Sequence, residues 1–140
     1  AAQMTVPVYK VISIDPNIPI SSQLPKVMVL QQRHQLAGHG IVIDTMVAGE
    51  YGGTGQRFDW ELAAGLAEGF DMSLAGGLTP DNVGEAVAQV RPWGVDTSSG
   101  VETDGEKDPA KIRAFIEAVR EADVALARSP LKRLLGWGRS

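Results

Sequence analysis

The sequence has 140 residues, of which 44% are hydrophobic and 21% are charged, and its formal net charge at pH 7 is −4. This length and composition are typical of one globular domain and argue against wholesale disorder. The sequence contains no cysteine, which excludes a disulfide framework, a thiolate metal site and a cysteine nucleophile within it.

The basic side chains gather near the end of the sequence. Residues 128–140 carry four of the 13 basic side chains and none of the 17 acidic ones, so the preceding part is acidic. We interpret residues 1–127 as the folded domain and residues 128–140 as a basic C-terminal tail or helix. The acidic body argues against nucleic-acid binding. With no apolar run suited to a membrane span or signal peptide, we expect a cytoplasmic protein.

The first predicted unit is a strand followed by a helix. The apolar run Val6–Ile14 predicts the strand, with Pro7 at its start, where a missing N–H is tolerated. The helix is expected over Lys26–Leu36, and Gly38 is well placed to end it. The intervening passage contains three prolines, which we interpret as a loop: Pro16, Pro19 and Pro25.

The next units repeat this pattern. The run Ile41–Asp44 predicts a strand, followed by the glycine-rich loop Gly49–Gly55 and a helix over Phe58–Leu66. The run Met72–Ala75 predicts a third strand, and Gly76-Gly77 closes it.

The last two helices have recognisable start signals. Thr79 at the cap and Pro80 at the first helical position predict a helix that runs to Arg91. A fourth strand is expected over Gly94–Thr97, and the last helix opens at Asp108-Pro109. Four strand–helix units in succession predict a parallel α/β sheet with every strand-end loop on one side.

Small, glycine-rich turns follow three of the four predicted strands. They are Gly52–Gly55, Gly76-Gly77 and Ser98–Gly100. Glycine lets backbone N–H groups approach a ligand, and ligands of parallel α/β folds bind at the carboxyl ends of strands. We therefore predict an anion site with phosphate as the expected ligand. The alternative is that these glycines only form turns.

Two acidic residues accompany these turns. Asp44 directly follows buried β residues, and Asp96 lies within the fourth run. Two carboxylates beside a phosphate suit proton transfer and hydroxyl binding on a sugar phosphate. A capping role is the alternative for Asp44, and we expect Glu50 and Glu102 to be solvated.

Other candidate residues carry weaker signals. His34 and His39 flank Gly38, so they do not share a helix face, and we expect surface residues and no metal site. Ser129 and Lys132 match an S-x-x-K pattern without the motifs that accompany it in serine acylases. A promiscuous hydrolase is therefore an alternative function.

Together, these motifs resemble the phosphoribosylanthranilate isomerase family of tryptophan biosynthesis. The resemblance covers about Gly40–Ala122 and rests on five motifs in order: Ile43–Thr45, Tyr51–Gly55 with Phe58–Trp60, Leu74–Val83, Gly94–Glu102 and Lys107–Pro109. It implies a TIM-type (βα)8 barrel that uses no cofactor and catalyses the Amadori rearrangement of N-(5-phosphoribosyl)anthranilate. The matched strands are the fifth to the eighth.

The resemblance also implies residue roles. Asp44 matches the general acid on the sixth strand, and Asp96 matches the eighth-strand acid that contacts the substrate. The implied ligand is a phosphorylated sugar, and no metal is implied. The backbone around six residues would hold the phosphate: Gly53, Gly55, Gly76, Gly77, Ser99 and Gly100.

The sequence departs from the family in one chemical respect. The family's general base is a cysteine on the first strand, and an arginine of the second unit meets the anthranilate carboxylate. The sequence has no cysteine and is too short for a complete barrel of about 200 residues. We therefore expect a parallel (βα)4 half-barrel with little native activity, completed as a homodimer because open sheet edges favour pairing. The alternative is a non-catalytic sugar-phosphate-binding half-barrel module.

Overall fold

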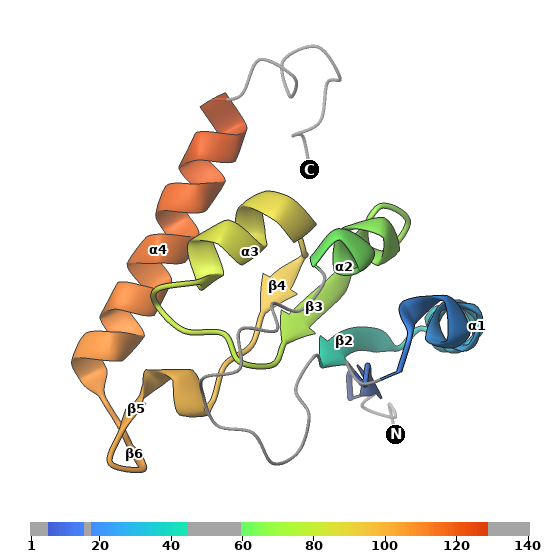
Figure 1. Cartoon of the computed structure of the whole chain (residues 1–140), viewed down its shortest axis with the longest axis horizontal. Helices are drawn as coiled ribbons and strands as arrows, with labels where there is room; N and C mark the ends of the chain where they lie inside the picture. Colours follow the sequence, from blue (N-terminus) through green and yellow to red (C-terminus); the bar gives the residue numbers. More distant parts are fainter. Residues whose placement is uncertain (1–5, 16–17, 45–59, 129–140) are drawn as a thin grey trace, which may run out of the picture.

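The structure, a computed structural model, describes residues 6–15, 18–44 and 60–128. Four parallel strands form one sheet in chain order: β1 (Tyr9–Ser13), β2 (Gly40–Asp44), β3 (Met72–Ala75) and β4 (Gly94–Val95). Four helices accompany them: α1 (Ile20–Leu36), α2 (Trp60–Ala67), α3 (Val83–Val90) and α4 (Pro109–Arg128) (Figure 1). The predicted succession of four strand–helix units and the parallel sheet are confirmed.

A short connection lies between β4 and α4. It contains the 3₁₀ helix η1 (Ser99–Val101) and a small antiparallel hairpin made of β5 (Glu102–Thr103) and β6 (Glu106–Lys107). The hairpin turn places Asp104 and Gly105 at positive φ angles of 53° and 81°. An Asp-Gly pair with two positive φ angles is typical of a type I′ turn, which matches the twist of a hairpin.

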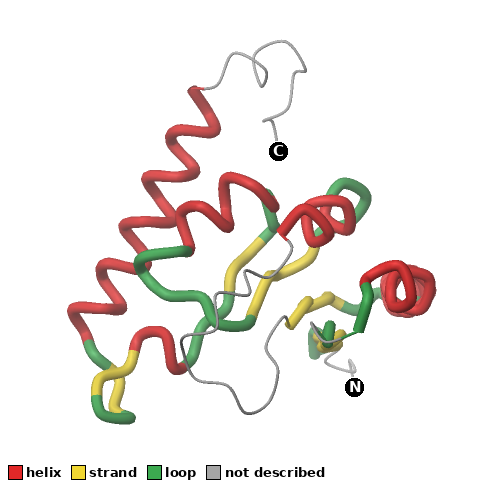
Figure 2. The backbone as a smooth tube through the Cα atoms, viewed as in Figure 1, coloured by secondary structure: helices red, strands yellow, loops and turns green. Residues whose placement is uncertain are grey.

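One face of the sheet carries the hydrophobic core. The register aligns Ile12, Ile43 and Leu74, which are at most 5% exposed. All four helices contribute side chains to the same cluster, including Val27, Ala63, Val87 and Phe115. The helices follow one another in an arc around the strands (Figure 2).

The other face of the sheet is open at β1. It carries Val11, Val42 and Ser73, which the register also aligns. Val11 is 62% exposed, whereas Val42 and Ser73 are half-buried. At the same face, the ring of Tyr9 lies over Gly40, where an added Cβ would stand 2.4 Å from the ring carbons.

Helix α1 begins earlier than predicted. It starts at Ile20 rather than Lys26, so Pro25 lies inside the helix rather than in a loop. We expected Pro25 to precede the helix, whereas in the structure Gln23 anchors the first turns of α1 to the preceding loop. Its side chain accepts the N–H of Asp15 at 3.0 Å and donates to the carbonyls of Asp15 and Ile18 at 2.7 and 2.8 Å.

Helix α1 ends at Leu36 as predicted, and Gly38, which we expected to end it, has a φ angle of 73°. The N–H of Gly38 donates to Gln35 and the N–H of His39 donates to His34, at 2.8 and 3.0 Å. These two bonds define a Schellman motif, in which glycine takes the left-handed position without steric cost. The turn brings His39 back over the last turn of the helix.

The start of α3 differs from the prediction, and the start of α4 agrees with it. Helix α3 begins at Val83 rather than Pro80, and the N–H groups of Asn82 and Val83 donate to the carbonyl of Thr79 in the turn that precedes it. Helix α4 begins at Pro109, where Asp108 Oδ1 accepts the N–H of Ala110 at 2.8 Å. The predicted start of α2 at Phe58 lies outside the described residues.

Candidate functional site

The two predicted acidic residues lie at the carboxyl edge of the sheet. Asp44 ends β2 and is paired in register with Ala75 of β3. The N–H of Asp96 donates to the carbonyl of Leu74 at 2.8 Å, which extends the ladder of β4 by one residue. Asp44 and Asp96 therefore flank Ala75 from its two sides. Their backbones lie about 10 Å apart, because neighbouring strands are about 4.8 Å apart.

The two carboxylates also belong to the same face. Side chains alternate along a strand, so Asp44 shares the open face with Val42, and Asp96 shares it with Gly94. Asp44 is half-buried and Asp96 is exposed. This arrangement directs both side chains to one side of the sheet, as a pair that acts on one small ligand requires.

The loops that follow β3 and β4 are fixed to each other. The hydroxyl of Thr97 donates to the carbonyl of Leu78 at 2.7 Å. Gly100 lies directly against that carbonyl, because an added Cβ would stand 1.8 Å from the Leu78 oxygen. No larger residue fits at position 100 without moving one loop away from the other.

The loop after β3 depends on two glycines and one asparagine. Gly76 and Gly77 have φ angles of 98° and 61°, which L side chains rarely adopt. Asn82 Nδ2 donates to the carbonyl of Gly77 at 2.9 Å, and Asn82 Oδ1 accepts the N–H of Thr79 at 2.8 Å. Asn82 therefore holds the turn in one shape, and neither glycine has a side chain of its own that would separate its backbone from a ligand.

A lysine that we did not predict as a site residue lies beside η1. Lys107 Nζ donates to the carbonyl and the hydroxyl of Ser98 at 2.9 and 3.1 Å, and it forms a 2.5 Å ion pair with Glu102. Lys107 and Glu102 thus place an ion pair next to the loop after β4. The only sequence feature that singled out Lys107 was its place in the motif Lys107–Pro109, and that motif did not indicate a role for the side chain.

The start of α4 is tied to the same hairpin. Asp108 Oδ2 accepts the hydroxyl of Thr103 at 2.8 Å, and Oδ1 accepts the N–H groups of Ala110 and Lys111. These hydrogen bonds, with that from Thr103 the strongest, lower the pKa of Asp108 below its ordinary value. Lys111 Nζ donates to the carbonyl of Glu102 at 2.6 Å, which closes the connection between hairpin and helix.

Several predicted residues lie outside the described part of the chain. These are the loop Gly49–Gly55 with its predicted phosphate-binding residues Gly53 and Gly55, and the candidate hydrolase pair Ser129 and Lys132. The described part of the predicted phosphate site consists of Gly76, Gly77, Ser99 and Gly100, on the two loops that contact each other.

The two histidines are closer than their sequence positions suggested. Their Nδ1 atoms lie 3.4 Å apart, because the turn at Gly38 folds His39 back onto His34. Partial burial, followed by the charges of His39, Lys10 and Arg33, lowers the pKa of His34. Both residues are half-buried, and their contact with each other is a feature that the sequence did not predict. Among the described residues, no group of three or more side chains is suited to hold a metal ion.

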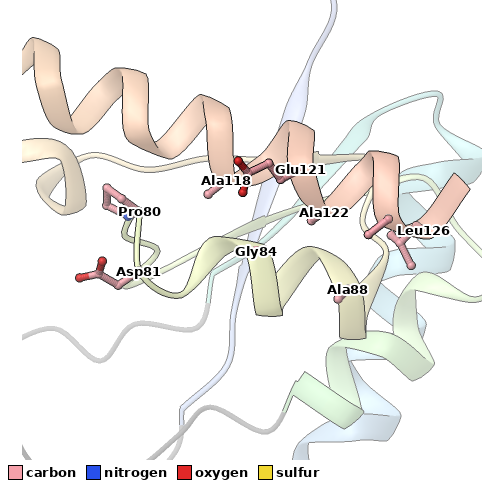
Figure 3. A pocket seen from close by; sticks show the side chains of 9 residues that line it. Pro80, Asp81, Gly84, Ala88, Ala118, Glu121, Ala122 and Leu126 are labelled. Carbon is pink, nitrogen blue, oxygen red and sulfur yellow. The ribbon is translucent and has the colours of Figure 1, made fainter. Parts of the chain in front are cut away.

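Two hollows in the described part of the chain lie away from these acids. One, of about 590 Å³, lies between α3 and α4 and is lined largely by small residues such as Gly84, Ala88 and Ala122 (Figure 3). The other, of about 640 Å³, includes Phe70 and Trp93 near the amino ends of β3 and β4. Neither hollow includes Asp44 or Asp96. None of the described helices is long and apolar enough to cross a membrane.

Comparisons with known proteins agree on one family. The model of the family N-(5'phosphoribosyl)anthranilate (PRA) isomerase matches residues 8–118. An N-(5'-phosphoribosyl)anthranilate isomerase of Roseiflexus castenholzii is 56% identical over 89 residues, which are 64% of this chain and 42% of that protein.

Solved structures give the same result. The phosphoribosyl anthranilate isomerase of Thermotoga maritima is 33% identical with a TM-score of 0.65, over 83% of this chain and 52% of that one. A second is a PRA isomerase in complex with reduced 1-(o-carboxyphenylamino)-1-deoxyribulose 5-phosphate. It is 28% identical with a TM-score of 0.60, over 83% of this chain and 50% of that one.

The chain thus spans about half the length of these solved relatives, and less of the curated one. Its parallel α/β fold matches that of the TIM-barrel PRA isomerases over that part. Because the family model matches well over half of the sequence, the chain belongs to the PRA isomerase family.

Proposed function

We propose that this chain supplies the phosphate-binding and acid-bearing part of a PRA isomerase site. The observation that carries the proposal is the contact between the loops after β3 and β4, beside which Asp44 and Asp96 flank Ala75. In βα barrels, a phosphate is commonly held by the loops after the last two strands and a short extra helix. Here η1 is that short helix, and Gly76, Gly77, Ser99 and Gly100 supply the backbone.

The proposed chemistry gives each acidic residue one task. As the general acid, Asp44 donates a proton to the ribose ring oxygen while the bond from that oxygen to C1 breaks and the anthranilate nitrogen forms a C1=N iminium bond with its lone pair. A base then removes the proton from C2, which neutralises the iminium and gives an enolamine. The C2 hydroxyl of the enolamine loses its proton and C1 gains one, which gives the ketone of the product. Asp96 contacts the substrate rather than the moving proton. The phosphorylated ligand bound by the related structure supports a sugar phosphate as the substrate class.

The general base of the family is a cysteine, and the sequence of this chain contains no cysteine to take that role. Loss of one proton-transfer partner costs about 10² to 10⁴ in rate. We therefore expect the chain alone to bind the sugar phosphate and to turn over the anthranilate substrate slowly. Binding with no turnover at all identifies the alternative, a non-catalytic sugar-phosphate-binding module.

We further propose that the (βα)4 unit corresponds to strands five to eight of the barrel and pairs with a second copy. The open face at β1, where Tyr9 and Val11 are 53% and 62% exposed, supports this pairing. A two-fold arrangement is the commonest way to cover such a surface. Light scattering at micromolar concentration tests it, and a folded monomer of single-chain mass contradicts it.

Calorimetric titration with ribose 5-phosphate tests the proposed function. Replacement of Gly77 by Val forces a β-branched side chain into a left-handed conformation and should abolish binding. Gly38→Val is the matched control, because Gly38 has a similar φ angle at the end of α1. Equal binding by both folded variants contradicts the proposed phosphate site.

The catalytic role is tested separately by the loss of substrate fluorescence over time. Asp44→Asn should lower the residual turnover at least about 100-fold while ribose 5-phosphate still binds. Turnover unchanged by this substitution removes Asp44 from the role of general acid. The hydrolase alternative rests on Ser129 and Lys132, which lie outside the described residues, and no observation favours it.

A further inference from the structure

A second hollow lies at the edge of the sheet away from the proposed site. It occupies about 640 Å³ between the ends of α2 and α3 and the last turns of α4. Its apolar lining includes Phe70, Trp93 and Leu126. The N–H of Trp93 donates to Met72 at 2.8 Å, which fixes its backbone beside β3, yet Trp93 is 67% exposed.

The rim of this hollow is acidic. Glu68, Asp71 and Asp123 contribute three exposed carboxylates, and Arg91 contributes one guanidinium. An apolar floor with a net negative rim fits a ligand that combines apolar side chains with positive charges. A segment with this combination follows directly in the sequence.

That segment is residues 129–140. It contains three cations, no acidic residue and four large apolar side chains: Lys132, Arg133, Arg139, Leu131, Leu134, Leu135 and Trp137. It begins immediately after Arg128, the last residue of α4, and Leu126 already lines the hollow. Twelve residues reach about 40 Å when extended, so the whole hollow is within range.

We propose that residues 129–140 dock in this hollow of their own chain. Attachment to α4 keeps the segment at an effective concentration in the millimolar range, so individually weak contacts suffice. Docking covers the ring of Trp93 and pairs Lys132 and Arg133 with the acidic rim. The hollow lies at the edge of the sheet opposite the phosphate loops, so docking of the segment does not depend on the proposed function.

A disulfide trap tests the proposal, because the sequence contains no competing cysteine. The trap variant carries Gln89→Cys, in the lining of the hollow, and Gly138→Cys in the segment. The control variant carries Gly138→Cys with Gln32→Cys, an exposed position on α1 at the other end of the strand order. We expect the intrachain cross-link to form at least about tenfold faster in the trap variant.

Charge substitutions in the same trap variant test whether the acidic rim attracts the segment. Asp123→Lys places a like charge in the rim and should slow cross-linking at least about threefold, less so at high salt. Glu117→Lys, also exposed on α4 but outside the hollow, should leave the rate unchanged. Equal rates in trap and control variants overturn the proposal. So do cross-links that form only between chains and rise with concentration, which would assign the hollow to the segment of a second copy.

Discussion

The β3–β4 side of the sheet and the β1 side differ in how far the chain covers its own surface. On the open face, Ser73 of β3 is half-buried and Ala75 is 9% exposed, and the loops that follow β3 and β4 touch at Gly100 and Leu78. On β1, Tyr9 and Val11 are more than half exposed, although Ile12 is buried. On the β3–β4 side, contacts within the chain therefore cover the sheet. On the β1 side, apolar side chains remain exposed, and such a surface is typical of a contact site for another protein.

We expect the largest effect from a substitution that disrupts the contact between the loops after β3 and β4. Gly100→Ala places a methyl group against the Leu78 carbonyl and should lower the free energy of unfolding by about 3 kcal/mol. Gly65→Ala is the control, because Gly65 lies in α2 and an added Cβ there meets no described atom within 4 Å. The control should gain up to about 1 kcal/mol. Urea unfolding measures both, and equal losses contradict the close loop contact.

A second prediction concerns the helix that covers the β1 side. Gln31 of α1 is fully buried, and its Nε2 donates to the carbonyl of Leu66 at 3.1 Å. Gln31→Ala removes this bond and leaves a cavity, so we expect a loss of about 2 kcal/mol. Gln32→Ala, on the exposed side of the same helix, should change the free energy of unfolding by less than about 0.5 kcal/mol.

A third substitution, with a smaller expected effect, tests the hydroxyl of Thr97 separately from the packing of the two loops. Thr97→Val keeps the shape of the side chain and removes its hydrogen bond to Leu78, which should cost about 1 kcal/mol. Because Gly100 still fixes the loops, binding of ribose 5-phosphate should weaken only a few-fold. Binding abolished by Thr97→Val would mean that the hydroxyl itself contacts the ligand.

The smallest effect is a pH dependence at the start of α4. The pKa of Asp108 is lowered in the folded protein by its hydrogen bonds, so its contribution to stability is present above the ordinary value of 3.8. The contribution is lost as the pH falls below 3.8 toward the lowered value. Asp108→Asn should lower the melting temperature by about 2 to 4 °C at pH 7 and have less effect near pH 2. Equal effects at both pH values contradict the shift.

The sequence signals that predicted the fold correctly are local ones. Apolar runs of four or five residues specify β2 and β3, Gly38 ends α1, and Asp108-Pro109 begins α4. Each depends on residues within one turn or one strand, so it can be read without knowledge of distant contacts.

The errors come from side chains that act across the sequence. Gln23 binds the backbone at Asp15, eight residues earlier, and so allows α1 to begin before Pro25. Lys107 reaches back nine residues to Ser98, and the two histidines meet through the turn between them. Hydrogen bonds of this kind have no periodicity, so the spacing of apolar residues does not predict them.

The contact between Thr97 and Leu78 has a consequence for the order in which the chain folds. These residues are 19 positions apart, whereas the pairing of Tyr9 with Gly40 joins residues 31 positions apart. Contacts between nearer residues close shorter loops and lose less chain entropy. The segment from β3 to η1 is therefore suited to act as a folding nucleus, onto which β2 and then β1 add as later strands.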